Sequence, residues 1–94
     1  MSKNPRLKDG FGQVSSLVIK DPAISLRDKA VYAYLSLYAD SESNSLFVSV
    51  NRIAADLNIT PSTVKRSIKS LMLAGVISRY SNGIGKSHTT ILLK

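Results

Sequence analysis

The sequence predicts a single α+β domain, mainly α-helical with a small β-hairpin, and three observations lead to this prediction. Apolar residues recur at helical spacing in three stretches, each preceded by a Ser or Thr that can cap a helix. After Gly75 the spacing becomes strand-like, and an Asn-Gly pair separates two β-prone segments. With 94 residues, 44% of them hydrophobic, the chain is long enough for one modest core.

The amino-terminal part of the chain is expected to lie at the edge of the domain. Residues 1–12 are polar and basic and predict a flexible arm, which leaves residues 13–94 as the folded domain. Gln13–Lys20 is expected to be a short strand or an extended segment packed on the body. Asp21-Pro22 is typical of a turn and ends this segment.

A first helix is expected to begin after Ser25, which can cap it with Asp28 in the capping-box position. Asp28, Lys29, Tyr32 and Ser36 share one arc of this helix, which is expected to face solvent. Apolar side chains fill more than half of the circumference: Leu26, Ala30, Val31, Ala33, Tyr34, Leu35, Leu37 and Tyr38. A helix this apolar indicates a central pillar or one covered on two sides, and the exposed Tyr32 is a candidate contact with a second subunit.

A second, shorter helix is predicted after a loop at Asp40–Ser45 and a candidate strand at Leu46–Val48. Ser49 can cap this helix, which runs from about Val50 to Leu57. Its inward side chains are expected to be those of Val50, Ile53, Ala54 and Leu57. Asn58-Ile59 breaks the helix, because Asn tolerates the left-handed conformation that a tight turn needs.

The third helix is expected over Pro61–Ala74, capped by Thr60, with Pro61 at its first position, where the missing N–H is not needed. Val64, Ile68 and Leu71 fall on one side at helical spacing and should point inward. Gly75 is expected to end the helix. Two strands, Val76–Tyr80 and His88–Leu93, then enclose a flexible loop, Ser81–Ser87, that contains Asn82-Gly83.

The charge is divided unevenly along the chain. Thirteen Lys and Arg face six Asp and Glu, for a net charge of +7, and all six acids lie in the first 56 residues. The part from Leu57 to Lys94 holds six basic residues and no acid. This half therefore carries a positive field that attracts polyanions, and nucleic acid is the first candidate ligand.

Two neighbouring stretches carry a family resemblance. Asn51–Leu71 (NRIAADLNITPSTVKRSIKSL) and the following Met72–Arg79 (MLAGVISR) resemble bacterial winged helix-turn-helix proteins, above all the domains near the start of phage and plasmid replication proteins. Phe11–Tyr38 is similar to the lead-in of that family, and Asn58 departs from it by standing at the usual glycine position of the turn. The resemblance covers roughly residues 11–80. It implies a double-stranded DNA-binding fold and leaves replication, plasmid partition and transcription control open.

The resemblance also implies where DNA would be read. The early residues of the second helix of such a motif reach base edges, which selects Ser62, Thr63, Lys65 and Arg66, and Lys69 further along should meet a phosphate. Phosphate contacts are expected from Ser49, Asn51, Arg52 and Thr60, and the wing residues Arg79, Lys86 and His88 should reach a phosphate or the minor groove. The competing interpretation is an ordinary solvated helix face and a surface hairpin.

Other functions lack a motif. One His, no Cys and scattered acids offer no catalytic triad, carboxylate pair or metal cluster, and Asn82–Lys86 lacks the full phosphate-loop pattern, so neither an enzyme nor a cofactor is expected. No segment is apolar enough to span a membrane and no signal peptide is recognisable, so a cytoplasmic location is expected. The alternatives are a winged helix that binds a protein partner and, third, a single-stranded nucleic-acid binder. A homodimer is expected, joined by the first helix or by Ile91–Leu93, since one recognition helix gives a small footprint.

Overall fold

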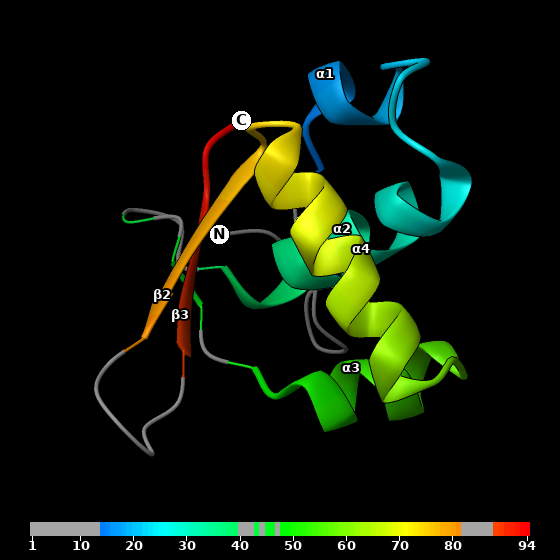
Figure 1. Cartoon of the computed structure of the whole chain (residues 1–94). Coiled ribbons are helices and arrows are strands. Elements are labelled where there is room, and N and C mark those ends of the chain that lie inside the picture. Colours follow the sequence, from blue (N-terminus) through cyan, green and yellow to red (C-terminus); the bar gives the residue numbers. More distant parts are fainter. Residues whose placement is uncertain (1–13, 40–42, 44, 47, 82–87) are drawn as a thin grey trace, which may run out of the picture.

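A computed structural model describes residues 14–39, 43, 45–46, 48–81 and 88–94. Helices lie on one side of the molecule and a small sheet on the other (Figure 1). The elements are, in chain order, α1 (Ser16–Ile19), α2 (Leu26–Tyr38), β1 (Ser45–Leu46), α3 (Val50–Leu57), α4 (Pro61–Leu73), β2 (Ile77–Ser81) and β3 (His88–Leu92). The predicted α+β class is confirmed, with three longer helices and a carboxyl-terminal pair of strands.

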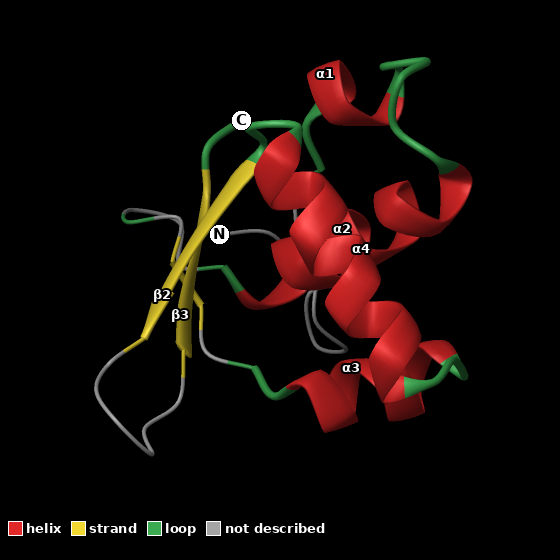
Figure 2. Ribbon diagram, viewed as in Figure 1, coloured by secondary structure: helices red, strands yellow, loops and turns green. Residues whose placement is uncertain are grey.

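The sheet is antiparallel, with the strand order β1-β3-β2 (Figure 2). Ile77 pairs with Leu92 between β2 and β3, and Ser45 pairs with Ile91 between β1 and β3. The predicted hairpin strands are confirmed to within one residue at their ends. The candidate strand at Leu46–Val48 instead covers Ser45–Leu46, so Ser45 belongs to a strand and not to the predicted loop. The predicted hairpin loop falls on residues 82–87, which lie outside the described part.

The three longer helices begin where the sequence predicts. The Ser25 hydroxyl accepts the Asp28 N–H at 3.1 Å, and the Ser49 hydroxyl accepts the Arg52 N–H at 3.1 Å. The Thr60 hydroxyl accepts the Thr63 N–H at 3.2 Å. Such a side-chain cap is worth about 1 kcal/mol, because it satisfies an N–H group that the helix itself leaves unpaired.

Left-handed residues end α3 and α4. Asn58 has a φ of 57° and Gly75 a φ of 76°. After α4 the Gly75 N–H bonds the Met72 carbonyl at 3.0 Å, and the Val76 N–H bonds the Leu71 carbonyl at 3.2 Å. This pair of bonds satisfies two carbonyls at the helix end and turns the chain directly into β2.

The core lies between the helices and the sheet. Val64 and Leu71 of α4 are fully buried, and Ile68 is 4% exposed, so the predicted inward side of this helix is confirmed. They belong to a cluster that also includes Val31 and Leu35 of α2, Ile53 and Ala54 of α3, Leu46 of β1, Ile77 of β2 and Leu92 of β3. One face of every longer element therefore contributes to a single core. Within the described residues, no helix has the length and apolar character required to cross a bilayer.

The segment before α2 differs from the prediction. Gln13–Lys20 was expected to be extended, whereas Ser16–Ile19 forms one helical turn. The Ser15 hydroxyl accepts the Leu17 N–H at 3.2 Å, and the turn buries Val18 completely. The β-branched residues favour a strand, but no neighbouring strand is paired with them, so the local cap and the burial of Val18 decide the conformation.

The buried face of α2 also differs from the prediction. Tyr32 is 1% exposed and its hydroxyl donates to the backbone carbonyl of Lys94, so it is not an exposed dimer contact. Asp28 and Ser36 are buried as well, while Leu26 is 84% exposed and Leu37 is also exposed. The helix has two apolar arcs. The buried one contains Val31, Tyr32 and Leu35, and its Tyr32 hydroxyl has a hydrogen-bond partner inside the protein. Asp28 Oδ1 lies 3.1 Å from Arg27 Nη2, so within the described residues this carboxylate pairs with Arg27 and not with the Ser25 N–H of a capping box.

Gly75→Ala should lower the free energy of unfolding by about 1 kcal/mol, because a side chain disfavours the left-handed conformation that Gly75 adopts. A Cβ at this position would meet no atom within 4 Å, so backbone strain is the sole cause of the effect. Urea denaturation measures the change. Gly75→Asn, which tolerates a positive φ better, is the matched control and should lose less stability.

Candidate functional site

The outer side of α4 is polar and open to solvent. Lys65, Arg66 and Lys69 are exposed, as is Ser62, and α4 lies in front of α2 in Figure 1. The opposite side of the helix holds Val64 and Leu71 against the core. This arrangement follows from helical spacing. Residues three or four apart share one side of a helix, so once Val64 and Leu71 are buried, the residues between them on the opposite side face outward.

The positive charge on α4 is not neutralised by the described parts of the protein. In these parts the only ion pair joins Arg27 to Asp28, at the start of α2. The sequence has no acid after Asp56, so nothing on α4, β2 or β3 can balance Lys65, Arg66 and Lys69. An uncompensated cationic helix face is suited to an anionic ligand.

A chain of hydroxyl contacts runs along the start of α4. Thr60 Oγ1 and Thr63 Oγ1 are 2.8 Å apart, and Arg66 Nη2 donates to Thr63 Oγ1 at 3.4 Å. Arg66 is thereby drawn toward the amino-terminal turns of the helix. Thr63 is half-buried and makes these internal bonds, so it is less accessible than Ser62.

The start of α3 carries the predicted residues Ser49, Asn51 and Arg52, and all three are exposed. The tight turn at Asn58 connects α3 to α4 and brings the two helices into contact. Thr60 is exposed at the start of α4. The first N–H groups of both helices carry a partial positive charge, which favours an anionic ligand at each of these two helix starts.

The wing residues are less uniform. Arg79 of β2 pairs with Thr90 of β3 and is half-buried, and this burial lowers the pKa of its guanidinium. Arg79 is consequently less available than the α4 cations. His88 begins β3, where its backbone pairs with Ser81. Lys86, Gly83 and Gly85 lie outside the described residues.

Four side chains join α2 to α3 in a cluster that sequence reasoning missed. The Tyr34 hydroxyl donates to Asp56 Oδ2 at 2.5 Å, and the Tyr34 and Tyr38 rings are 5.2 Å apart at a tilt of 43°. The Arg52 guanidinium lies over the Tyr38 ring, 5.8 Å from its centroid. Burial, assisted by the bond to Asp56, raises the pKa of the Tyr34 hydroxyl, which therefore keeps its proton to a higher pH than a solvent-exposed tyrosine does. The spacing of four residues within each pair, Tyr34–Tyr38 and Arg52–Asp56, is the signal that was available.

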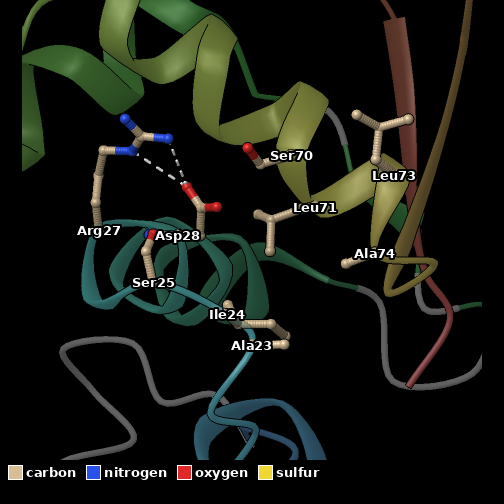
Figure 3. A pocket seen from close by; sticks show the side chains of 9 residues that line it. All are labelled: Ala23, Ile24, Ser25, Arg27, Asp28, Ser70, Leu71, Leu73 and Ala74. Atoms are coloured by element: carbon tan, nitrogen blue, oxygen red, sulfur yellow. Dashed lines mark hydrogen bonds and ion pairs between the residues drawn. The ribbon is translucent and has the colours of Figure 1, made fainter.

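A shallow cavity of about 360 Å³ lies between the start of α2 and the end of α4 (Figure 3). Ile24, Leu71 and Leu73 supply apolar walls, and the Arg27–Asp28 pair forms a polar side. The cavity is at the opposite end of α4 from Ser62. Nowhere in the described ranges do three His, Asp or Glu side chains gather closely enough to hold a metal ion.

Residues 23–77, more than half of the chain, match the family described as a helix-turn-helix domain. The chain belongs to the helix-turn-helix domain family. In this helix-turn-helix domain, α3 and α4 are the two helices of the motif, Asn58–Thr60 is the turn, and β2 and β3 form the wing. No match was found among curated proteins.

Two solved structures resemble this helix-turn-helix domain. One is described as "N-Terminal domain of DNA binding protein", with 19% identity, a TM-score of 0.67, and coverage of 100% of this chain and 82% of that chain. The other is "Structure of Rep-DNA complex", with 18% identity, a TM-score of 0.67 and the same coverage, 100% and 82%. At this level of identity the likeness confirms the winged helix-turn-helix fold, as the sequence predicted.

The protonated Tyr34 hydroxyl predicts a loss of stability at alkaline pH. Its folded-state pKa is raised above the ordinary value of 10.0, so the folded chain holds this proton more tightly than the unfolded chain does. This contribution is fully present below pH 10 and is lost as the pH rises further. Tyr34→Phe should show a constant decrease in stability below pH 10 and a shallower decline above it than the wild type. Urea midpoints between pH 8 and pH 11 measure this, with the exposed Tyr80→Phe as control; equal alkaline slopes in wild type and Tyr34→Phe would contradict it.

Proposed function

We propose that this domain binds double-stranded DNA, with α4 in the major groove and the β2–β3 hairpin against the neighbouring backbone. The observation that carries this proposal is the exposed, unneutralised face of α4, where Lys65, Arg66 and Lys69 stand beside Ser62. Membership of the helix-turn-helix family supports it, because in this motif the second helix enters the groove.

The residues divide into two groups by role. Base edges are read by Ser62, Thr63, Lys65 and Arg66, and a bidentate contact from Arg66 to guanine contributes about 1–3 kcal/mol of discrimination. Position on the duplex is set by contacts to phosphates, from Lys69, from the starts of α3 and α4, and from the wing. The positioning group comprises Ser49, Asn51, Arg52, Thr60, Lys69, Arg79, Lys86 and His88.

A role in replication is favoured among the processes that use such domains. One of the similar structures is described as that of a Rep–DNA complex, and the likeness covers the whole of this chain. Plasmid partition and transcription control are the competing roles, since the same motif serves all three. Binding to plasmid or phage replication-origin DNA, against promoter and partition-site DNA of the same source, distinguishes them.

The second candidate function is binding of a protein partner. Leu73, which lines the cavity at the end of α4, is 81% exposed. Leu26, which lies in the sequence between the cavity residues Ser25 and Arg27, is 84% exposed. Exposed apolar side chains mark a protein interface where they join into one contiguous patch, and this candidate requires that Leu26 and Leu73 do so around the cavity. This candidate predicts binding that changes little with salt, whereas DNA binding depends on it steeply.

The first test measures affinity for duplex DNA over a range of salt concentrations. Each neutralised phosphate contributes about −0.9 to the slope of log affinity against log salt, because binding releases condensed cations. Four to six contacts therefore predict a slope of about −4 to −5. Fluorescence anisotropy with a labelled duplex of random sequence gives the slope. An affinity that is undetectable, or independent of salt, would overturn the proposal in favour of a protein partner.

The second test separates base reading from phosphate contact on α4. Arg66→Ala should weaken binding to a selected site about tenfold or more and relax the preference at one base pair. Lys69→Ala should weaken binding on all sequences alike and make the salt slope shallower by about 0.9. Lys20→Ala, which removes an exposed cation at the end of α1, is the matched control and should change neither quantity. If Arg66→Ala and Lys69→Ala both behave like Lys20→Ala, α4 is not the DNA-binding surface.

We further propose that the domain acts as a homodimer through the outward face of α2. Leu26, Ala30 and Leu37 are exposed on one side of this helix, which makes them better contacts than the buried Tyr32. Leu37→Asp should shift the chain to a monomer, because it places a charge in an apolar interface. Sedimentation equilibrium measures the mass, with Leu17→Asp on α1 as control; a monomeric wild type, with or without duplex, would refute the dimer.

A further inference from the structure

The cluster of Tyr34, Tyr38, Arg52 and Asp56 at the junction of α2 and α3 serves a purpose beyond joining two helices. Arg52 lies in the first turn of α3 and is exposed, with its guanidinium 5.8 Å from the centroid of the Tyr38 ring. A planar guanidinium that stacks on an aromatic face keeps the N–H donors along its edge free. Those donors match the oxygen atoms of a phosphate, which they bind in a bidentate manner.

Asp56, the acidic residue nearest to Arg52 along α3, accepts a hydrogen bond from a tyrosine of α2. Asp56 follows Arg52 by four residues on α3, a spacing at which oppositely charged side chains on a helix commonly pair. The Tyr34 hydroxyl instead donates to Asp56 Oδ2 at 2.5 Å, and in the part of the chain that the structure describes no ion pair involves Arg52. Tyr34 is 7% exposed and held in the core cluster, so its hydroxyl is a fixed donor.

The location of Arg52 favours an anion. The Ser49 hydroxyl caps α3 just before it, and the first N–H groups of a helix carry a partial positive charge. Arg52 is exposed, and α3 leads through the turn at Asn58 into α4, the helix with the open cationic face. A phosphate of the DNA backbone next to the α4 contacts is thus the ligand that this guanidinium fits.

We propose that Tyr38 is a positioning residue for Arg52: its ring orients the guanidinium, so that Arg52 binds one backbone phosphate. This inference rests on the proposed DNA binding. It assigns a role to a tyrosine of α2 that is not among the residues proposed above to contact DNA. It also makes the proposed interface depend on α2, which lies outside the two helices of the motif.

The experiment measures the affinity of the full 94-residue chain for a labelled random-sequence duplex at several KCl concentrations. Arg52→Ala should weaken binding about tenfold at low salt. The slope of log affinity against log salt should be shallower by about 0.9, which corresponds to one phosphate contact. Tyr38→Ala should produce a smaller change in the same direction. Tyr38→Phe, which keeps the ring face, should bind as the wild type does. In the Arg52→Ala background, Tyr38→Ala should have no further effect.

Thermal unfolding identifies any variant that fails to fold. If Tyr38→Ala does not fold, Tyr38→Leu, which removes the ring but keeps an apolar side chain, takes its place.

Each remaining outcome has a defined meaning. If the wild type binds no duplex, the proposed function fails and the inference fails with it. If the wild type binds and Lys69→Ala weakens it, but Arg52→Ala has no effect, the proposed function holds and the inference is wrong. The inference is also wrong if Arg52→Ala weakens binding while Tyr38→Ala retains the wild-type affinity and slope.

Discussion

The burial of one side of α4 is the constraint on which the rest of this domain depends. Val64, Ile68 and Leu71 pack into the core shared by α2, α3 and the sheet. Once that side is fixed, helical geometry leaves Lys65, Arg66 and Lys69 no position except the surface. The free energy of hydrophobic burial therefore keeps three like charges together in the open, where they repel one another and attract a polyanion.

Two backbone positions convert this packing into a defined surface. The left-handed conformation at Asn58 sets the angle between α3 and α4, and that at Gly75 directs the chain from α4 into β2. Both turns are closed by hydrogen bonds to the carbonyls of the preceding helix, so the directions of the elements are held locally. The capped start of α3, the cationic helix and the hairpin are arranged by these short connections rather than by long loops.

Polar contacts between α2 and α3 hold a further cation of the proposed DNA-binding surface in place. The bond from Tyr34 to Asp56 and the cation–π contact of Arg52 with Tyr38 link α2 to the first helix of the motif. A cation that is oriented before binding loses less conformational freedom when a phosphate arrives. Helix α2 is in this respect both the scaffold of the core and a support for the proposed phosphate contact.

The sequence by itself determined the caps of the three longer helices, the inward side of α4, the left-handed turns and the hairpin strands. These features depend on hydrogen bonds and periodicities within a few residues, and each is visible in the order of side chains from Ser25 to Leu92. Only the tertiary structure decided which arc of α2 is buried, that residues 16–19 form a helical turn, that β1 pairs with β3, and that Arg52 meets Tyr38. The physical reason is that α2 has two apolar arcs of similar extent. The choice between them rests on partners far along the chain, such as the Lys94 carbonyl that accepts the Tyr32 hydroxyl, and no local pattern encodes those partners.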